Sequence, residues 1–293
     1  MIWGFELWVM SGYPERISVV ADGPCEGMTI NELVAKEKGA LLGKANYERF
    51  GNEFPLLVKF IEAHQDLSIQ VHPNEEMAQR VHGGHGKTEM WYVIRTEDGA
   101  HLYSGLSKAI TPEEYEKRIA DNSIVDVLAD HHIAPGDVFF LPAGRIHAIC
   151  GGTYLAEIQQ TSDLTYRIYD YGRPGADGKP RQLHTELAKQ AIDYKVYDNY
   201  RTDYQPRKNA EVQIADCPYF TTSVYDMDAP VQKDLSSLDS FVIVMCLEGE
   251  GSVDTGDEAM DLKAGDCILV PATASSVKFT PDSSLKLLTS YIK

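Results

Sequence analysis

The sequence is short of positive charge. Among its 293 residues, 27 Lys and Arg stand against 44 Asp and Glu, which gives a formal net charge of −17 and an isoelectric point near 4.9. No block of basic residues interrupts this excess of acid. Nucleic acid and anionic membrane surfaces are therefore unfavourable partners. A small anionic substrate is not excluded, because a few Lys or Arg side chains can dominate the field inside a pocket.

Cysteine is also scarce, and long apolar runs are missing. The five cysteines are odd in number and never spaced as Cys-x-x-Cys; they are Cys25, Cys150, Cys217, Cys246 and Cys267. This usage predicts reduced thiols in a cytoplasmic protein rather than a disulfide framework. The N-terminal stretch MIWGFELWVMSG has no basic segment and no long apolar run. We therefore expect neither a signal peptide nor a membrane span.

Glycine and proline, by contrast, are well supplied, and one turn-rich pattern occurs twice. The chain has 23 Gly and 14 Pro with 43% hydrophobic residues, which fits a mainly β protein. Residues 134–143 (APGDVFFLPA) resemble residues 263–272 (KAGDCILVPA), since each places Gly-Asp before four mostly apolar residues and Pro-Ala. Such an internal repeat predicts two related β-barrels, over residues 1–200 and 205–293, joined by a polar linker near residues 193–212.

Two segments of the first half have helical signals instead. Thr29 and Glu32 have the spacing of a capping box, and apolar residues follow at helical intervals. Thr111 and Pro112, followed by two acidic residues, form a well-defined helix start. We predict that residues 29–49 and 111–130 are mostly helical and lie outside the barrel strands.

The stretch from residue 67 to residue 94 (LSIQVHPNEEMAQRVHGGHGKTEMWYVI) has the features of a metal site. Apolar and polar residues alternate between positions 67 and 72, so Gln70 and His72 project from one face of a strand. Glu89 opens a second strand, and His147 on a later strand is the candidate for a fourth ligand. Imidazole nitrogen and carboxylate oxygen are ligands that zinc accepts. The second half has residues 273–276 (TASS) in place of a His, so its barrel is predicted to hold no metal.

Four motifs in order resemble the zinc-dependent type I mannose-6-phosphate isomerases in their short bacterial form, within the cupin superfamily. They are QVHPN, GKTEMWY, PAGRIHA and, over residues 157–170, EIQQTSDLTYRIYD. Two departures are visible. Only Trp3-Gly4 remains of a Trp-Gly-Gly region, and Ile149 stands where eukaryotic members carry Tyr. The resemblance implies a mainly β fold of two cupin-type barrels (jelly rolls), with the helical segments inserted in the first. It also implies one Zn²⁺ per chain, held by Gln70, His72, Glu89 and His147.

The same resemblance suggests three catalytic side chains. Lys87 lies two residues before Glu89, so both would face the cavity, where a buried amine is costly unless it meets an anion; the alternative is an edge lysine with a solvated amine. Arg167 matches a substrate-binding arginine whose fork suits oxygens or phosphate. Glu157 matches a cavity carboxylate. The alternative for Arg167 and Glu157 is an ion pair between them, with Asp170 as another partner for Arg167.

The implied reaction interconverts mannose 6-phosphate and fructose 6-phosphate through an enediol, with a phosphorylated hexose as the partner. Either Glu157 or a metal-bound water would carry the proton, and Gln70 would bind the metal directly or support a ligand. Two other functions are compatible with a cupin site. An iron dioxygenase usually has His-x-His, so Gln70 speaks against it. A sugar-sensing module without turnover would use the same Lys and Arg. The oligomeric state is left open.

Overall fold

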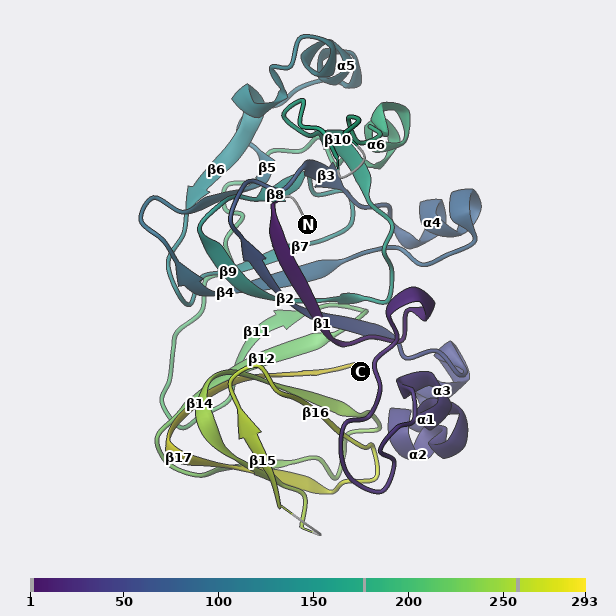
Figure 1. Cartoon of the computed structure of the whole chain (residues 1–293), viewed down its shortest axis with the longest axis vertical. Coiled ribbons are helices and arrows are strands. Elements are labelled where there is room, and N and C mark those ends of the chain that lie inside the picture. Colours follow the sequence, from purple (N-terminus) through teal and green to yellow (C-terminus); the bar gives the residue numbers. More distant parts are fainter. Residues whose placement is uncertain (1–2, 176–177, 257–258) are drawn as a thin grey trace. The chain divides into compact units, whose positions relative to one another are not determined.

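The computed structural model describes residues 3–175, 178–256 and 259–293. The chain divides into two compact units (Figure 1). The first unit contains the chain up to Leu7 and Lys59–Thr202, and the second contains Trp8–Val58 and Asp203–Lys293. No helix in the described residues is both long enough and apolar enough to cross a membrane.

Two five-stranded sheets form the first unit, counted over its described residues. One sheet has the order β1 (Gly4–Met10), β2 (Leu56–Ala63), β9 (Thr153–Gln160), β4 (Glu89–Thr96) and β7 (Val138–Leu141). The other has the order β10 (Tyr166–Tyr169), β3 (Ile69–Val71), β8 (His147–Ile149), β5 (His101–Leu106) and β6 (Leu128–His132). Pairing in both sheets is antiparallel wherever a register is given, so neighbouring strands present their side chains in matched rows.

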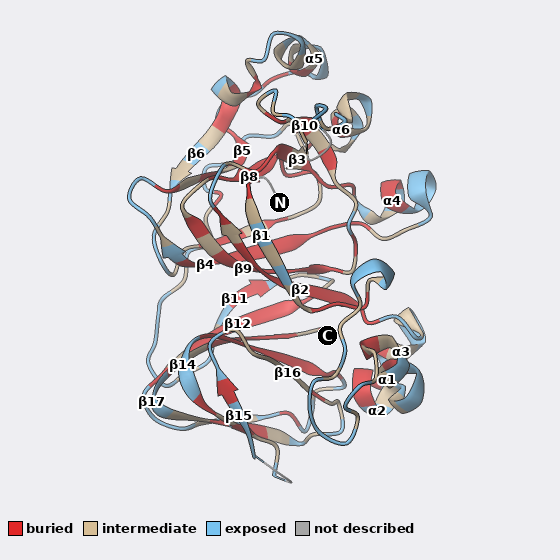
Figure 2. Ribbon diagram, in the orientation of Figure 1, coloured by how far each residue is buried: buried red, intermediate tan, exposed pale blue. Residues whose placement is uncertain are grey.

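Side chains from both sheets pack together in one apolar cluster, which includes Trp91, Leu102 and Phe139. The second sheet buries its other face against helices. Ile69 and Val71 of β3 pack in a second cluster with residues of α5 (Pro112–Ala120), η2 (Ile124–Val127) and α6 (Thr185–Ala191). Because side chains alternate along a strand, Gln70 is directed to the opposite face from its two apolar neighbours. Strands β4 and β9 are buried along most of their length (Figure 2).

In the second unit, the described strands of Asp203–Lys293 form one seven-stranded sheet. Its central path is β11 (Val212–Asp216), β12 (Thr221–Met227), β17 (Ser276–Tyr291), β14 (Val242–Asp254) and β15 (Ala259–Lys263); β13 (Val231–Asp234) pairs with β17 and β16 (Cys267–Val270) with β14. The long strands β14 and β17 shift register around Gly249. A Cβ there would lie 2.0 Å from the carbonyl oxygen of Ser284, so only glycine fits.

The predicted helices are present. Thr29 and Glu32 form a complete capping box at the start of α1 (Ile30–Glu37), which is followed by the short helices α2 (Gly39–Leu42) and α3 (Lys44–Phe50). Thr111 caps α5 as predicted. Residues 128–130, which the sequence pattern predicts to be helical, instead begin the edge strand β6. The remaining elements are η1 (Pro14–Arg16) and α4 (Glu75–His82).

The grouping of residues 29–49 differs from the prediction that they are inserted in the first barrel. Residues 8–58 belong to one unit with the C-terminal part of the chain. Hydrogen bonds explain why. The Asp239 carboxylate accepts from the backbone N–H groups of Lys44 (2.9 Å) and Ala45 (3.1 Å), at the start of α3. The buried Asn46 side chain donates to Ser240 Oγ at 3.2 Å. These contacts join residues far apart in sequence, which local patterns do not reveal.

Asp239 should therefore stabilise the second unit. Its carboxylate satisfies two N–H groups at a helix start that have no partner within the helix. We expect Asp239→Ala to lower the free energy of unfolding of this unit by about 1 kcal/mol, the usual cost of losing such a cap. The measurement is a thermal and urea unfolding series. Asp239→Asn is the control, because its amide oxygen still accepts one bond; equal losses in both variants would contradict the interpretation.

Candidate active site

Three charged or metal-ligating side chains converge inside the first unit. His72 follows β3, Glu89 begins β4 and His147 begins β8. One ligand atom from each lies within 4.8 Å of the other two. Glu89 Oε2 is 3.5 Å from His72 Nε2, and Glu89 Oε1 is 3.3 Å from His147 Nε2. Since all three residues have 2% or less of their surface exposed, this is an interior site.

Backbone carbonyl groups orient both imidazoles. His72 Nδ1 lies 2.8 Å from the carbonyl oxygen of Leu164, and His147 Nδ1 lies 2.8 Å from that of Arg145. Each Nδ1–H can therefore donate to a carbonyl, which leaves the lone pair of Nε2 directed at Glu89. This is the tautomer in which a histidine binds a metal through Nε2.

The fourth predicted ligand, Gln70, lies beside this group. Its Nε2 is 3.2 Å from His147 Nε2, and the backbones of the two residues are paired across β3 and β8. A half rotation of the amide brings Oε1 to the same position, where an oxygen can act as a ligand. All four residues predicted to form the metal site are thus brought together.

The unpaired atoms of this group fit a cation. His72 Nε2 and Glu89 Oε1 are buried without a hydrogen-bond partner among the described residues, and Glu89 Oε2 has the Lys87 amine at 3.2 Å. Buried acceptors without partners are costly, and two imidazoles with a carboxylate form a donor set that zinc accepts. A bound divalent cation would satisfy both unpaired atoms at once. The residues present therefore fit the metal that the sequence implies.

Lys87 adds a positive charge to the same place. Its Nζ lies 3.2 Å from Glu89 Oε2, and its side chain is 5% exposed. Burial would lower the pKa of Lys87, but the carboxylates of Glu89, Glu157 and Asp163 raise it above its usual value. Lys87 is therefore a charged residue facing the interior, as predicted, and not an edge lysine with a solvated amine.

The same charges fix the protonation of the candidate ligands. Burial and the charge of Lys87 lower the pKa of His72 to about 3. Burial also lowers the pKa of His147. Burial would raise the pKa of Glu89, yet Lys87 and His72 hold it well below its usual range. Two neutral imidazoles and an ionised carboxylate are the forms that bind a metal, so no proton has to leave them near neutral pH.

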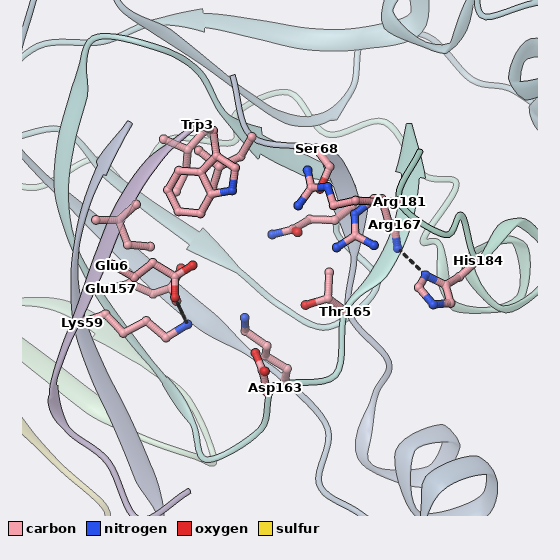
Figure 3. Close-up of a pocket in the computed structure, with 15 residues that line it drawn as sticks. Trp3, Glu6, Lys59, Ser68, Glu157, Asp163, Thr165, Arg167, Arg181 and His184 are labelled. Atoms are coloured by element: carbon pink, nitrogen blue, oxygen red, sulfur yellow. Dashed lines mark hydrogen bonds and ion pairs between the residues drawn. The ribbon is translucent and has the colours of Figure 1, made fainter. Parts of the chain in front are cut away.

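A cavity of about 280 Å³ opens above this group, within the first unit. Gln70 and Lys87 are among the residues that line it. Figure 3 shows that one wall carries Trp3, Glu6, Lys59 and Glu157, and that the facing wall carries Ser68, Thr165, Arg167, Arg181 and His184. The lining is mostly polar and contains several cations, which suits a hydroxylated, anionic ligand.

On the first wall, Glu157 is held by two neighbours. Glu157 Oε2 accepts from Trp91 Nε1 at 2.8 Å, and Glu157 Oε1 lies 3.0 Å from Lys59 Nζ (Figure 3). Lys59 is only 3% exposed. The expected alternative, an ion pair between Glu157 and Arg167, is not formed. The two residues lie on opposite walls with the cavity between them.

On the facing wall, Arg167 has no carboxylate within ion-pair distance among the described residues. Its Nη1 donates to the carbonyl oxygen of Gln182 at 3.0 Å, and its Nε is buried without a partner. Asp170, the other expected partner, instead forms ion pairs with Arg173 and Arg181, at 2.8 and 2.6 Å. The Arg167 backbone N–H donates to His184 Nδ1 at 3.1 Å. Arg167 is thus a cation positioned by backbone contacts and available to an anion.

Lys59 and Arg181 are two cavity residues that the sequence analysis did not identify. Lys59 is a charged residue with apolar neighbours on both sides in the strand sequence LLVKFIEA, and such a charge inside a buried strand was a signal that could have marked it. Arg181 belongs to a polar Gly/Pro loop and had no distinguishing pattern. Its position depends on the pairing with Asp170.

Comparison with known proteins places this site in a family. Residues 4–95 match the catalytic domain of type I phosphomannose isomerase, and residues 210–292 match the mannose-6-phosphate isomerase cupin domain. The probable mannose-6-phosphate isomerase GmuF of Bacillus subtilis is 36% identical over 91% of this chain and 83% of its own length. The chain belongs to the type I mannose-6-phosphate isomerases. The sequence prediction of a cupin isomerase of this family is confirmed.

Further mannose-6-phosphate isomerases are similar to this chain. The Streptococcus mutans enzyme is 32% identical over 98% of this chain and 88% of its own length. The crystal structure of the Bacillus subtilis mannose 6-phosphate isomerase has a TM-score of 0.87 and 32% identity, over 99% of this chain and 90% of that chain. A zinc-bound mannose 6-phosphate isomerase has a TM-score of 0.79 at 19% identity, over 98% of this chain and 91% of that chain, and so shows the shared fold.

The low pKa of His72 predicts how the metal-free protein responds to acid. In the unfolded chain His72 takes up a proton near pH 6.5, whereas in the folded chain its pKa is about 3. The unfolded state therefore binds more protons between these values, and stability should fall as the pH falls below 6.5. The contribution is up to about 1.4 kcal/mol per pH unit. The test is to measure the free energy of unfolding of the metal-free wild type and of His72→Gln between about pH 3 and pH 6.5. If the two proteins lost stability in parallel as the pH falls, His72 would not be the cause.

Proposed function

We propose that this protein interconverts mannose 6-phosphate and fructose 6-phosphate, through an enediol, with one zinc ion per chain at the active site. The observation that carries the proposal is the buried group of His72, Glu89 and His147 beneath a polar cavity. Its unpaired acceptor atoms suit a divalent cation, and the cavity wall offers cations to a phosphorylated ligand. Family membership makes isomerisation the expected use of that arrangement.

His72, Glu89 and His147 would hold the zinc ion, with Gln70 as a fourth ligand. Bound there, zinc would polarise the oxygens on C1 and C2 of the sugar. The chain's own residues prepare the site. Lys87 balances the charge of Glu89 without occupying its Oε1, and the carbonyl groups on both Nδ1 atoms keep the imidazoles from rotating. A rigid, buried ligand set of this kind would orient the reacting end of the sugar.

Arg167 and Arg181 would bind the phosphate and the sugar oxygens. Both line the cavity, and the guanidinium fork matches the spacing of phosphate oxygens. The cost of keeping Arg167 partly buried with Nε unpaired would be recovered when an anion binds. Arg181 would be the fixed member of the pair, because its Nε and Nη2 both donate to the Asp170 carboxylate.

We assign the proton transfer to Glu157. Its carboxylate faces the cavity from the wall opposite Arg167, and Trp91 and Lys59 fix its orientation. A carboxylate in this place can remove a proton from one carbon and return it to the neighbouring carbon. The adjacent Lys59 would keep the Glu157 carboxylate in place and supply positive charge as the enediol forms.

The proposed partner is a phosphorylated hexose, and the proposed compartment is the cytoplasm. The cations of the cavity support the first point despite the net charge of −17. The second is supported by the cysteines, since all five are free thiols. The comparisons favour neither a dioxygenase nor a sensing module. The experiment below distinguishes an isomerase from a sensing module.

Removing the metal should abolish turnover. We expect a chelator to stop the interconversion of the two sugar phosphates while most of the β structure remains, because the apolar clusters do not include the ligands. Zinc should restore the rate. Glu89→Gln should bind zinc more weakly, since the amide keeps the shape but removes the ligand charge.

A coupled assay with elemental analysis of the same samples measures both quantities. If verified metal-free protein turned over at the normal rate, the proposal would fail. If zinc bound stoichiometrically but neither sugar phosphate were converted, a sensing module would be the better description.

Arg167→Ala should lower kcat/KM by about 10²–10³ and leave the zinc content unchanged, because the residue stabilises negative charge on the ligand and does not touch the metal group. Arg167→Lys should recover part of the loss, since the charge is kept and the fork is not. Arg95→Ala is the matched control, because Arg95 is an exposed arginine of the same unit outside the cavity. If Arg167→Ala had a kcat/KM close to that of the wild type, Arg167 would have only a structural role.

A further inference from the structure

A second group of metal-ligating side chains lies in the first unit, apart from the cavity. It consists of Asp66, His101 and Cys150, and one ligand atom from each lies within 4.8 Å of the other two. Asp66 is in the loop before β3, His101 is the first residue of β5, and Cys150 follows β8. None of these residues lines the active-site cavity or takes part in the proposed reaction.

The sheet brings the three residues together at one end of adjacent strands. β8 lies between β3 and β5. Leu102 of β5 is paired with Ile149 of β8, so the preceding His101 comes opposite Cys150. The Asp66 side chain is tied to the same place, because its Oδ1 accepts from the N–H of Gly151 at 2.9 Å. The grouping therefore follows from strand register and is not a chance approach of mobile surface side chains.

The donor set is that of a borderline divalent metal ion. One thiol, one imidazole and one carboxylate are ligands that zinc and cobalt accept, whereas calcium and magnesium prefer oxygen alone. Cys150 has no exposed surface, while Asp66 and His101 are partly exposed and leave a path for an ion.

A nucleophilic function for Cys150 fits less well. His101 Nδ1 lies 2.7 Å from Asp130 Oδ1, so cysteine, histidine and aspartate resemble a catalytic triad. A reactive cysteine, however, needs access and a lowered pKa. Cys150 is fully buried, and burial together with the negative charges of Asp66 and Asp130 raises the pKa of its thiol. The thiol is therefore protonated and shielded. A metal ion reverses this, because its charge favours the thiolate.

We propose that Asp66, His101 and Cys150 form a second, structural site for a divalent transition metal, with zinc as the expected occupant. Binding forms a bond between Cys150 Sγ and the metal, and the thiol proton is released to solvent. The existing contact between His101 and Asp130 orients the imidazole, as carboxylates behind metal-bound histidines commonly do.

The site would link the ends of β3, β8 and β5. β3 carries Gln70, and β8 carries His147, three residues before Cys150. A metal ion at this end would restrain the strands that position two of the four proposed active-site ligands. It would also stabilise the folded state in proportion to the logarithm of metal concentration above its dissociation constant.

Cobalt titration into the full chain, first stripped of metal, tests the proposal. Cobalt bound to a thiolate gives a charge-transfer band in the near ultraviolet, and the group of His72, Glu89 and His147 contains no sulfur. The band therefore reports on the second site alone, whether or not the first site binds. We expect the band to grow to one equivalent and one proton to be released from the thiol. Elemental analysis after zinc loading should give two ions per chain.

Variants separate the ligands from the fold. Cys150→Ser should remove the band and one zinc ion. Asp66→Asn keeps the oxygen that accepts from Gly151 and should weaken cobalt binding by about 10–100-fold, the size of effect that loss of a metal partner commonly has. Cys267→Ser is the matched control and should keep the band, because Cys267 belongs to the second unit. The proposal is overturned if wild type gives no thiolate band, or if Cys150→Ser or Asp66→Asn leaves it unchanged.

Discussion

The structure of the first unit depends on a carboxylate that has no contact with water. Glu89 is completely buried, and an isolated charge in such a place would be prohibitively costly. Lys87 compensates it from one side, and the imidazoles of His72 and His147 approach from the others. The two histidines come from strands of one sheet, and the carboxylate begins a strand of the other. The pairing of the strands therefore brings together the groups that stabilise the buried Glu89 carboxylate. The negative charge of this carboxylate in turn makes the interior suitable for a cation.

The charged side chains that line the cavity are not evenly distributed between its two walls. Although the protein is strongly acidic overall, Arg167 and Arg181 dominate one wall and Glu157 with Lys59 the other. This arrangement would give a bound anion one orientation, because Arg167 and Arg181 lie on the same wall. The carboxylates around Lys87 also keep its amine charged, so this part of the lining changes little with pH near neutrality.

Sequence reasoning identified the elements that local patterns control. Alternation around Gln70, the capping box at Thr29 and the Thr111-Pro112 start were sufficient to locate a strand and two helical regions, and the family motifs supplied the candidate ligands. The position of Lys59 beside Glu157 and of Asp239 at the start of α3 was not predictable in this way. Both contacts join segments distant in the chain, and such pairings are set by tertiary packing rather than by propensity.

The discontinuous second unit has a consequence for synthesis of the protein on the ribosome. Trp8–Val58, with helices α1 to α3, is made before most of the first unit, yet its packing partners lie in Asp203–Lys293. Until those residues emerge, α3 lacks its hydrogen bonds to Asp239 and Ser240. Lys59–Thr202 is contiguous and can fold as soon as it leaves the exit tunnel. We therefore expect the nascent chain to fold from its middle outward, with the N-terminal helices packing last.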